Sequence, residues 1–468
     1  MKILTFSINP IFPDRVTGGA SKHLERVLRH LSEQGNQITL LCAAIDGKEY
    51  YFDLCPNVLV KAVLPFHLPF PQPYAIAPYE LTTITRIIQQ ELQAQDRFYI
   101  HDGELLLSGV YTQIPTIISF RDNVYPESVL GTFVGQADEI ICVSPYSADV
   151  ICSSAGLVLT GLRERIHAVP NGLDPEVFYP TNTNKIVDSL GVDPHNHRYL
   201  LHPHRPEASK GLKQALDILE VLINKYGHSD LILLVPDWLP EMQGVIENTF
   251  RQDMLRLIEK RKLTHHVRFH PWLRQEQLAA YYSMGSITLS VGNNPEAFGN
   301  VAYESIACGT SSVVAKVGTH RTQLPDNLIY KTEYDNPEKA ALVCDQILRN
   351  ATRVVEPDRL EVLALLNLEK QLSTYSEIIL HAKKREPMIM NSQFLQDATS
   401  YRLAPWCEMT PRGIFNDYRA AYLTDLDCQG VSTVRSLLSQ NNTISSNLFD
   451  KLTLSKLVDL GILIPIVN

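Results

Sequence analysis

The chain has 468 residues, more than one hydrophobic core usually serves, so we expect two or three domains. Hydrophobic residues make up 45% and charged residues 20%, close to the globular average, which excludes a largely disordered chain. The formal net charge of −9, with no long basic run, argues against a nucleic-acid-binding protein.

The N-terminal segment 1–13 has too short an apolar run for a signal peptide, and we expect it to contain a buried strand. No 18-residue apolar stretch occurs, so no transmembrane segment is predicted, although peripheral contact with a membrane stays open. The eight cysteines are scattered without a CxxC pair, which predicts neither a disulfide framework nor a thiolate metal site. We expect a cytoplasmic protein.

Short apolar runs alternate with helical patterns in the first part of the chain. Residues 21–34 form an amphipathic pattern with Leu24, Val27, Leu28 and Leu31 on one stripe. Such β-α-β alternation predicts a parallel sheet with helices on both faces. The strands expected here are 2–7, 37–42, 98–100, 116–120, 139–143 and 167–169.

A second series of the same kind begins near residue 198, with a helix expected at 213–225. Its expected strands are 199–202, 230–235, 267–270, 287–291 and 311–315. We therefore predict an α/β fold of two facing, doubly wound Rossmann-like domains joined by a hinge near 171–188. Ligands in such sheets bind beyond the carboxyl ends of the strands, and the cleft between the domains is the default site.

After about residue 385 the pattern changes to helices at 433–438 and 447–460, followed by an apolar run at 462–467. This order resembles a small winged-helix unit, and its balanced charge favours a docking module for a protein or peptide, or a structural appendage, over a DNA-binding role. The expected domains are an N-terminal Rossmann-like domain, a second Rossmann-like domain, a helix returning to the first domain and a small α+β extension. Their expected bounds are 1–180, 181–365, 366–385 and 386–468.

The strongest motif is a pair of glutamates, Glu296 and Glu304, separated by seven residues after the strand at 287–291. The motif opens a helix that Gly309 can close in a left-handed conformation. Gly299 has no side chain to cover the helix start, where the first backbone N–H groups lack partners within the helix. A diphosphate bound there would therefore contact several N–H donors and the positive end of the helix dipole. Glu304 would then face the ribose hydroxyls and Glu296 the sugar.

A second motif, His204-Arg205 to Lys210-Gly211, follows the strand at 199–202. Two cations five positions apart at a strand end can straddle a pyrophosphate, the arginine as a planar fork and the lysine as a point charge. Since negative charge builds on the leaving phosphate as the sugar bond breaks, these cations would stabilise the transition state more than the ground state.

These motifs, in the order Gly18-Gly19, Val169-Pro-Asn-Gly-Leu-Asp-Pro175, Arg205…Lys210-Gly211 and Glu-x7-Glu, resemble glycosyltransferase family 4 over residues 1–385. The resemblance implies the GT-B fold, a nucleotide-diphospho-sugar donor (a UDP- or GDP-sugar first), retention of configuration and no required metal. It also assigns the diphosphate to Arg205 and Lys210, the sugar hydroxyls to Glu296 and the ribose to Glu304. Backbone at Gly18, Gly19, Phe298, Gly299, Asn300 and Val301 would hold the phosphates.

The sequence departs from the family pattern in two places. The second Gly-Gly of the family, expected near Val317-Gly318-Thr319-His320, is altered, and so is a histidine position. Family members usually carry a histidine after the strand that ends at Phe120, and Arg121 stands there. We therefore treat Arg121 as a candidate catalytic residue that could keep the backbone carbonyl contact of the histidine, bind an acidic sugar or acceptor, or mark a weakened enzyme. His101 and Asp102, which follow the strand at 98–100, are candidate acceptor or sugar contacts.

Two alternatives stay open at this point. One is a GT-B epimerase or hydrolase that acts on the nucleotide sugar itself, and the other is a catalytically silent relative that binds a partner through its tail. The expected acceptor is a small molecule, peptide or protein. Asp425-Leu-Asp427 matches the Asp-x-Asp of metal-dependent transferases, but it lies in the tail, away from any strand end suited to a nucleotide, so no metal site is predicted.

Overall fold

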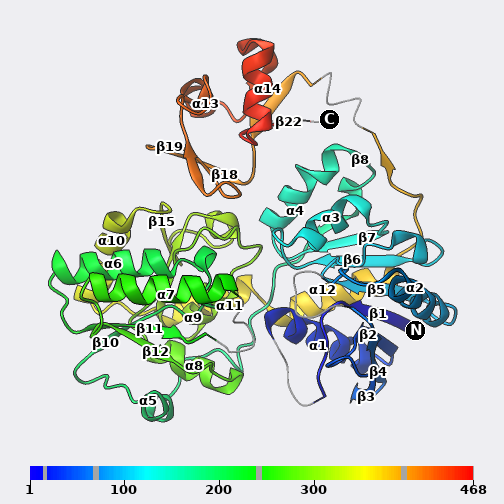
Figure 1. Ribbon diagram of the computed structural model, residues 1–468, viewed down its shortest axis with the longest axis horizontal. Helices are drawn as coiled ribbons and strands as arrows, with labels where there is room; N and C mark the ends of the chain where they lie inside the picture. Colours follow the sequence, from blue (N-terminus) through cyan, green and yellow to red (C-terminus); the bar gives the residue numbers. More distant parts are fainter. Residues whose placement is uncertain (14–17, 67–72, 239–244, 392–397, 467–468) are drawn as a thin grey trace. The chain divides into compact units, whose positions relative to one another are not determined.

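The structure is a computed structural model that describes residues 1–13, 18–66, 73–238, 245–391 and 398–466. Its contacts divide the chain into two compact units (Figure 1). Unit 1 comprises residues 1–170, 369–405 and 437–468, and unit 2 comprises residues 171–368 and 406–436. Each unit is described by itself below.

Unit 1 is built on an eight-stranded sheet with the order β3-β4-β2-β1-β5-β6-β7-β9. All neighbours are parallel except β3 and β4, which form an antiparallel hairpin at one edge. The central strands are buried on both faces, as expected for apolar runs in a parallel sheet. The bounds are Lys2–Ser7 (β1), Gln37–Ala43 (β2), Tyr50–Cys55 (β3), Val58–Leu64 (β4), Arg97–His101 (β5), Thr116–Phe120 (β6), Glu139–Cys142 (β7) and Ile166–Ala168 (β9).

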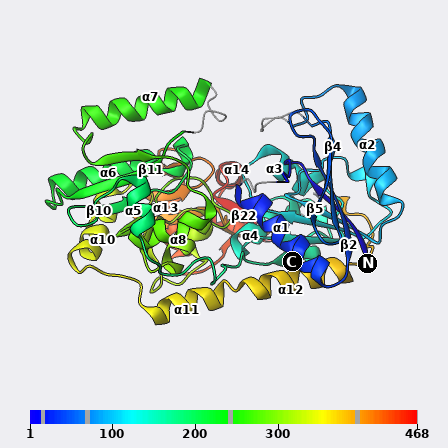
Figure 2. The same ribbon diagram turned by 90° about the horizontal axis from the view of Figure 1, so that it is seen from below.

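Helices cover both faces of this sheet. The stripe of α1 expected from the sequence packs with Tyr375 and Ile379 of α12 in one core cluster, whereas Ile84 and Ile88 of α2 and Ile151 of α4 belong to the cluster on the other face. Figure 2 shows α2 and α12 on opposite sides of the strands. The bounds are Gly18–Glu33 (α1), Pro78–Leu92 (α2), Pro126–Val134 (α3), Pro145–Cys152 (α4) and Leu368–His381 (α12).

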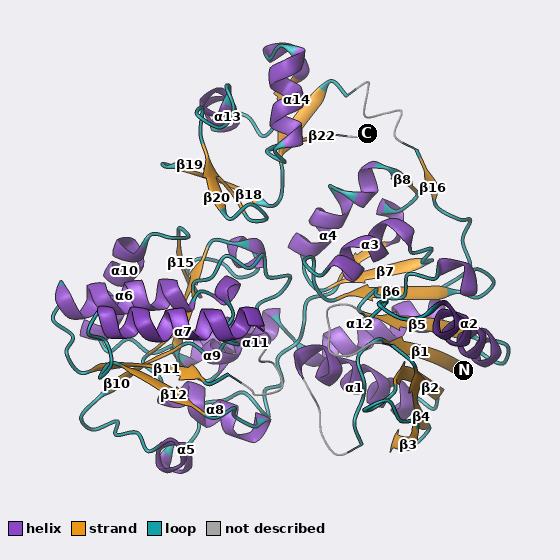
Figure 3. Ribbon diagram, viewed as in Figure 1, coloured by secondary structure: helices purple, strands orange, loops and turns teal. Residues whose placement is uncertain are grey.

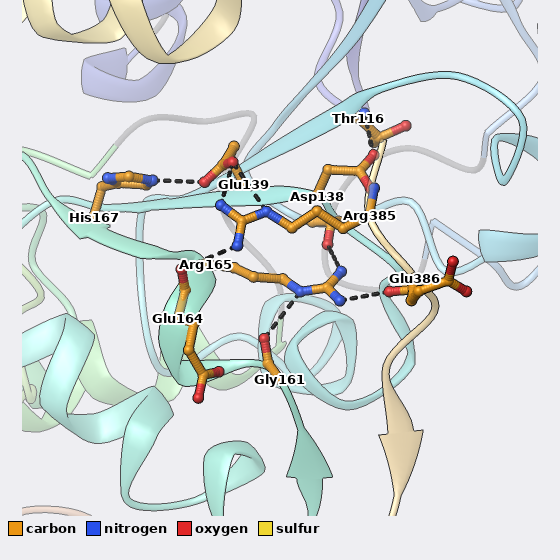
Figure 4. Close-up of polar contacts among 10 residues, drawn as sticks. Thr116, Asp138, Glu139, Gly161, Glu164, Arg165, His167, Arg385 and Glu386 are labelled. Carbon is orange, nitrogen blue, oxygen red and sulfur yellow. Dashed lines mark hydrogen bonds and ion pairs between the residues drawn. The ribbon is translucent and has the colours of Figure 1, made fainter. Parts of the chain in front are cut away.

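The chain that follows α12 is tied to unit 1 by a polar cluster (Figure 4). Asp138 is buried and accepts hydrogen bonds from the Thr116 backbone N–H (2.7 Å), the Arg385 backbone N–H (2.7 Å) and Lys384 Nζ (3.0 Å). The Arg385 guanidinium also pairs with Glu139 at 2.6 Å. Because a buried carboxylate needs such partners, Asp138 locks the end of α12 to β6 and β7.

Unit 2 has a six-stranded parallel sheet with the order β12-β11-β10-β13-β14-β15. This order reverses direction at β10, so β10 and β13 lie side by side at the point where ligands usually bind in doubly wound sheets. The bounds are Arg198–Leu201 (β10), Leu231–Pro236 (β11), Val267–His270 (β12), Ile287–Ser290 (β13), Ser311–Ala315 (β14) and Tyr330–Thr332 (β15).

The helices α6, α7 and α10 share one core cluster of unit 2 with the strands, and α9 packs with α8 and α11 and against β13 and β14 (Figure 1). Gly309 follows α9 with a φ of +86°, the left-handed conformation expected from the sequence. The bounds are Asn184–Leu190 (α5), Leu212–Asn224 (α6), Val245–Lys260 (α7), Gln275–Met284 (α8), Asn300–Ala307 (α9), Pro337–Arg349 (α10) and Glu356–Leu365 (α11).

Residues 386–468, expected as one appended domain, contribute to both units. In unit 1, β16 pairs with β8 and β17 lies between β21 and β22, while in unit 2 the strands β18, β19 and β20 form an antiparallel meander (Figure 3). The likeness to a winged helix stays a prediction. The bounds are Leu159–Thr160 (β8), Ile389–Met390 (β16), Ser400–Leu403 (β17), Cys407–Thr410 (β18), Gly413–Asn416 (β19), Ala421–Leu423 (β20), Val431–Leu438 (α13), Ile444–Ser445 (β21), Lys451–Asp459 (α14) and Leu463–Pro465 (β22).

Among the residues that the structure describes, no helix combines the length and apolar character that a membrane crossing requires.

Candidate active site

The loops after β10 and β13 carry the two motifs found in the sequence. The loop after β10 contains Arg205 and ends in the short turn Ala208–Lys210, and the loop after β13 contains Glu296 and leads into α9. Since β10 and β13 are parallel neighbours, their carboxyl ends lie at the same edge of the sheet.

Two glycines allow these loops to touch. Gly211 has a φ of +87°, and a Cβ atom on it would lie 2.5 Å from the backbone N of Gly292. A Cβ atom on Gly292 would lie 2.6 Å from the carbonyl carbon of Lys210, far inside ordinary contact distance. The Asn294 backbone N–H also donates to the Ser209 carbonyl at 3.0 Å. Because neither glycine has a side chain, the backbones of the two loops can lie in direct contact.

This contact places Lys210 beside Glu296. Lys210 Nζ donates to Glu296 Oε1 at 2.6 Å, and the two side chains are 17% and 23% exposed. Burial acts to raise the pKa of Glu296, but the charge and hydrogen bond of Lys210 outweigh burial and hold that pKa below its usual value. The pair is consequently an ammonium and a carboxylate at neutral pH.

The α9 helix begins beside the pair. Gly299 precedes the helix with a φ of +83° and, as a glycine, brings no side chain of its own to cap the helix start. Phe298 is buried and packs edge-on against Tyr303, with 5.1 Å between ring centroids. The first-turn N–H groups from Asn300 and Val301 onward thus form the positive end of the helix dipole.

Glu304 lies about one helical turn inside α9. Its Oε2 accepts a hydrogen bond from Tyr282 Oη of α8 at 2.9 Å, and burial together with the Glu304 charge raises the pKa of Tyr282. Tyr282 therefore remains a phenol that orients the Glu304 carboxylate. Sequence reasoning did not single out this tyrosine.

Arg205 is less enclosed than Lys210. Its side chain is 40% exposed, and its Nε lies 3.2 Å from a carboxylate oxygen of Glu207. The same loop carries His202 and His204, whose rings lie 4.9 Å apart and whose pKa values burial lowers. Both histidines are neutral side chains. The sequence analysis gave neither of them a role, although His204 begins the Arg205 motif and His202 ends the strand predicted before it.

His320 is a further residue of unit 2 that the sequence analysis did not single out. Its ring fills the space over Gly299, since a Cβ atom there would lie 2.8 Å from His320 Nε2. Burial lowers the pKa of His320 to about 4, so the ring is neutral. The position of Gly318 to His320, where the family pattern is altered, was the only sequence signal for it.

The remaining candidates belong to unit 1. Gly18 and Gly19 open α1, and His101 ends β5. His101 uses both ring nitrogens, Nδ1 with Tyr99 Oη (2.9 Å) and Nε2 with the Ala20 carbonyl (3.1 Å). Since only an N–H can bond to a carbonyl, Nε2 carries the proton, and His101 holds the first turn of α1.

Arg121 lies in a buried polar cluster with His23 and Tyr375. Arg121 Nη1 donates to Tyr375 Oη at 3.1 Å, and the His23 ring packs between His101 (5.6 Å) and Tyr375 (4.9 Å). Burial, with help from the Arg121 charge, keeps the pKa values of His23 and His101 low. The Arg121 guanidinium thus lies beside two histidine rings that burial keeps neutral. His23 and Tyr375 were missed, because they reach Arg121 from two helices far apart in sequence.

Asp102 follows His101 with a φ of +71°, and burial raises its pKa to about 7.

Asp425 and Asp427, the Asp-x-Asp of the tail, stabilise local turns. Asp425 Oδ1 accepts hydrogen bonds from the backbone N–H groups of Gly430 and Ser432 at 3.1 Å each, and Asp427 accepts one from the backbone N–H of Thr424 at 2.8 Å. Across the described part of the chain, no group of three or more His, Cys, Asp or Glu side chains is arranged to hold a metal ion.

Comparison with known proteins identifies the family of the chain. Residues 17–177 match the family described as Glycosyltransferase Family 4, and residues 191–359 match that described as Glycosyl transferases group 1. The D-inositol 3-phosphate glycosyltransferase of Nocardiopsis dassonvillei is 30% identical over 344 residues, which cover 66% of this chain and 76% of that protein. D-inositol 3-phosphate glycosyltransferase 1 of Catenulispora acidiphila is 30% identical over 192 residues, 40% of this chain and 43% of that protein, so the chain spans less than half of its length.

The fold is shared with solved structures. The structure of Anabaena Alr3699/HepE in complex with UDP and glucose superposes with a TM-score of 0.63 at 18% identity, covering 81% of this chain and 100% of that chain. The two doubly wound units are thus those of the GT-B fold expected from the sequence. The chain belongs to glycosyltransferase family 4, a family of enzymes that transfer sugars.

Proposed function

We propose that the protein transfers a hexose from a nucleotide-diphospho-sugar to an acceptor hydroxyl with retention of the anomeric configuration. The observation that supports this best is the Lys210–Glu296 pair beside the start of α9. The Lys210 ammonium has three N–H donors, and the bond to Glu296 uses one of them, which leaves two for phosphate oxygens. Glu296 in turn can accept hydrogen bonds from sugar hydroxyls.

In this proposal the diphosphate of the donor lies against Lys210, Arg205 and the N–H groups of Phe298 to Val301. Glu304, held by Tyr282, accepts from the ribose hydroxyls. A helix start and two cations are the groups that stabilise a diphosphate best when negative charge develops on it. UDP-glucose is the first donor to test, because the Anabaena structure of the same fold contains UDP and glucose.

The proposed reaction breaks the bond between the anomeric carbon and the β-phosphate oxygen and forms a bond from that carbon to the acceptor oxygen. The proton of the acceptor hydroxyl passes to the departing diphosphate on the same face of the sugar. The products are a nucleoside diphosphate and the glycoside. Arg205 and Lys210 lower the barrier because the charge that they neutralise increases as the sugar–phosphate bond breaks.

Arg121 is proposed as a catalytic residue in unit 1, in place of the family histidine. Its guanidinium keeps its charge, and Tyr375 orients it. A small-molecule acceptor with an acidic group is the class that such a cation favours. Inositol phosphate, from which the two relatives take their names, and a serine- or threonine-containing peptide are the two acceptors to compare.

The test measures donor binding and turnover separately. Calorimetry with UDP, GDP, ADP and dTDP should detect binding of one nucleoside diphosphate, and Lys210→Ala should lower kcat/KM by a factor of about 10² or more. Lys225→Ala is the matched control, since Lys225 is an exposed lysine of the same unit that pairs with Glu338 on the surface. Binding of none of the four nucleotides, or a Lys210→Ala enzyme as active as Lys225→Ala, would refute the proposal.

Product analysis separates transfer from the alternatives. Consumption of the donor should require the acceptor, and the glycoside should be the main product. Release of free sugar, or of an epimer, at full rate without acceptor would instead indicate a hydrolase or an epimerase.

A further inference from the structure

The meander β18–β20 of the tail is seated on unit 2 at the ends of β14 and β15. Phe415 is buried in a cluster with Ala315 and Val317, and its ring lies 5.1 Å from that of Tyr334. Beside this cluster, Arg412 stacks over the Tyr422 ring at 3.9 Å and donates to the Asp335 carbonyl at 2.9 Å. This part of the tail is thus docked on unit 2 by apolar packing, and Glu408 of β18 adds ion pairs with Lys316 (3.8 Å) and Arg321 (3.4 Å).

The loop after β19 adds a buried carboxylate to this contact. Asp417 accepts a hydrogen bond from Arg321 Nη1 at 2.8 Å and another from Arg321 Nη2, so the arginine fork binds it through two nitrogens. Its Oδ2 also accepts from the backbone N–H of Gly318 at 3.1 Å. Asp417 is itself held by its own N–H, which donates to the Trp406 carbonyl at 2.9 Å.

Gly318 in turn contacts Glu296, the residue proposed to bind the sugar. Gly318 has a φ of +57°, and a Cβ atom on it would lie 2.7 Å from the carbonyl oxygen of Glu296. The next N–H, that of Thr319, donates to the same carbonyl at 3.0 Å. The His320 ring then fills the space over Gly299. The turn Gly318–Arg321 therefore supports the segment 296–299 at both of its ends.

We propose that Asp417 is a positioning residue for Glu296, acting through the Gly318–Arg321 turn. The proposal rests on the function proposed above, in which Glu296 contacts the sugar and Lys210 the diphosphate. Asp417 fixes the Gly318 N–H and Arg321, and the turn so fixed holds the Glu296 backbone where Lys210 can pair with it. Residues 17–177 and 191–359 contain the two family matches, so Asp417 lies outside both.

The physical reason is the sensitivity of transfer to distance. An error of 1 Å in the position of a reacting or binding group can lower the rate about 100-fold. A turn that contains a left-handed glycine is soft unless its N–H groups have partners, and a buried carboxylate is a strong acceptor for them. In this proposal the tail positions Glu296 through Asp417, in addition to covering the edge of the sheet.

The test compares four variants of the full-length protein. Asp417→Ala should lower the kcat/KM for the donor about 10- to 100-fold, chiefly through kcat, because Glu296 loses its position and not its chemistry. Asp417→Asn retains an oxygen that can accept from Gly318, so it should recover most of the activity although the charge pair with Arg321 is lost. Arg321→Met/Asp417→Leu keeps the tail docked by apolar packing but offers Gly318 no acceptor, and it should be as impaired as Asp417→Ala.

Arg412→Ala is the matched control, because it weakens the docking of the same meander without touching Gly318. If Asp417 merely anchored the tail, activity would follow thermal stability across all four variants, and Arg412→Ala would lose activity together with Asp417→Ala. That result, or wild-type kcat/KM in Arg321→Met/Asp417→Leu while Lys210→Ala is impaired, overturns the inference and leaves the proposed function standing. Wild-type kcat/KM in Lys210→Ala would overturn both.

Discussion

The contact between the loops after β10 and β13 offers a sharp prediction, the effect of Gly292→Ala. A Cβ atom at this position would lie 2.6 Å from the carbonyl carbon of Lys210 and closer still to the Ser209 oxygen. An ordinary carbon–carbon contact needs about 3.5 Å, so the loops must separate by about 1 Å. That shift is large against the 2.6 Å bond between Lys210 and Glu296, and it should break this bond.

We expect Gly292→Ala to lower kcat/KM for the donor by about 10², equivalent to about 2.7 kcal/mol of transition-state stabilisation. Overpacking of this kind should also cost about 1–3 kcal/mol of folding stability. Steady-state kinetics with the donor varied and thermal denaturation measure the two effects. Gly109→Ala is the control, since Gly109 has open space where its Cβ would be. Gly292→Ala kinetics equal to those of Gly109→Ala would refute the idea that the glycine contact sets the position of Lys210.

Two further predictions concern unit 1. Because the pKa of Asp102 is raised from 3.8 to about 7, the folded state holds this proton more tightly than the unfolded state, and stability falls as pH rises from about 4 to 7. Asp102→Asn should therefore have a higher Tm than the wild type at pH 8, with the difference vanishing near pH 4; an equal gain at both pH values would contradict the assigned cause. Asp138→Ala leaves the N–H groups of Thr116 and Arg385 without their acceptor and should cost about 3–5 kcal/mol, a fall in Tm of about 6–20 °C by calorimetry. A change below about 2 °C would show that the cluster in Figure 4 does not hold the end of α12.

Local patterns in the sequence determined much of the fold. The strands at 2–7, 116–120, 267–270 and 311–315 match the structure residue for residue. Those at 2–7, 116–120 and 311–315 are buried on both faces, as expected inside a parallel sheet, whereas 267–270 is a partly exposed edge strand. The hairpin of β3 and β4 was not predicted. Its outer strand β3 is half exposed, whereas β4 is largely buried and nearly continuously apolar, so β4 was missed although its pattern could have revealed it.

The motifs likewise predicted the residues of the proposed nucleotide site of unit 2. Arg205, Lys210, Glu296 and Glu304 stand at fixed spacings after strands, and strand ends are where a doubly wound sheet binds ligands. Those spacings carried no information on which other side chains contact the motif residues. That Tyr282 orients Glu304, and that His320 covers Gly299, became visible only when the strands were in register.

Only the tertiary structure decided how the site is held together. Lys210 and Glu296 are 86 residues apart in the chain, and Gly318 and Asp417 are 99 residues apart. The spacing of apolar residues along the chain indicates which side of a strand or helix is buried. Contacts between residues so far apart in sequence depend instead on how the buried surfaces of different elements pack together. The contact between Gly211 and Gly292 is one example. Because neither residue has a side chain, the two backbones can approach closely, and this approach places the Lys210 ammonium beside the Glu296 carboxylate.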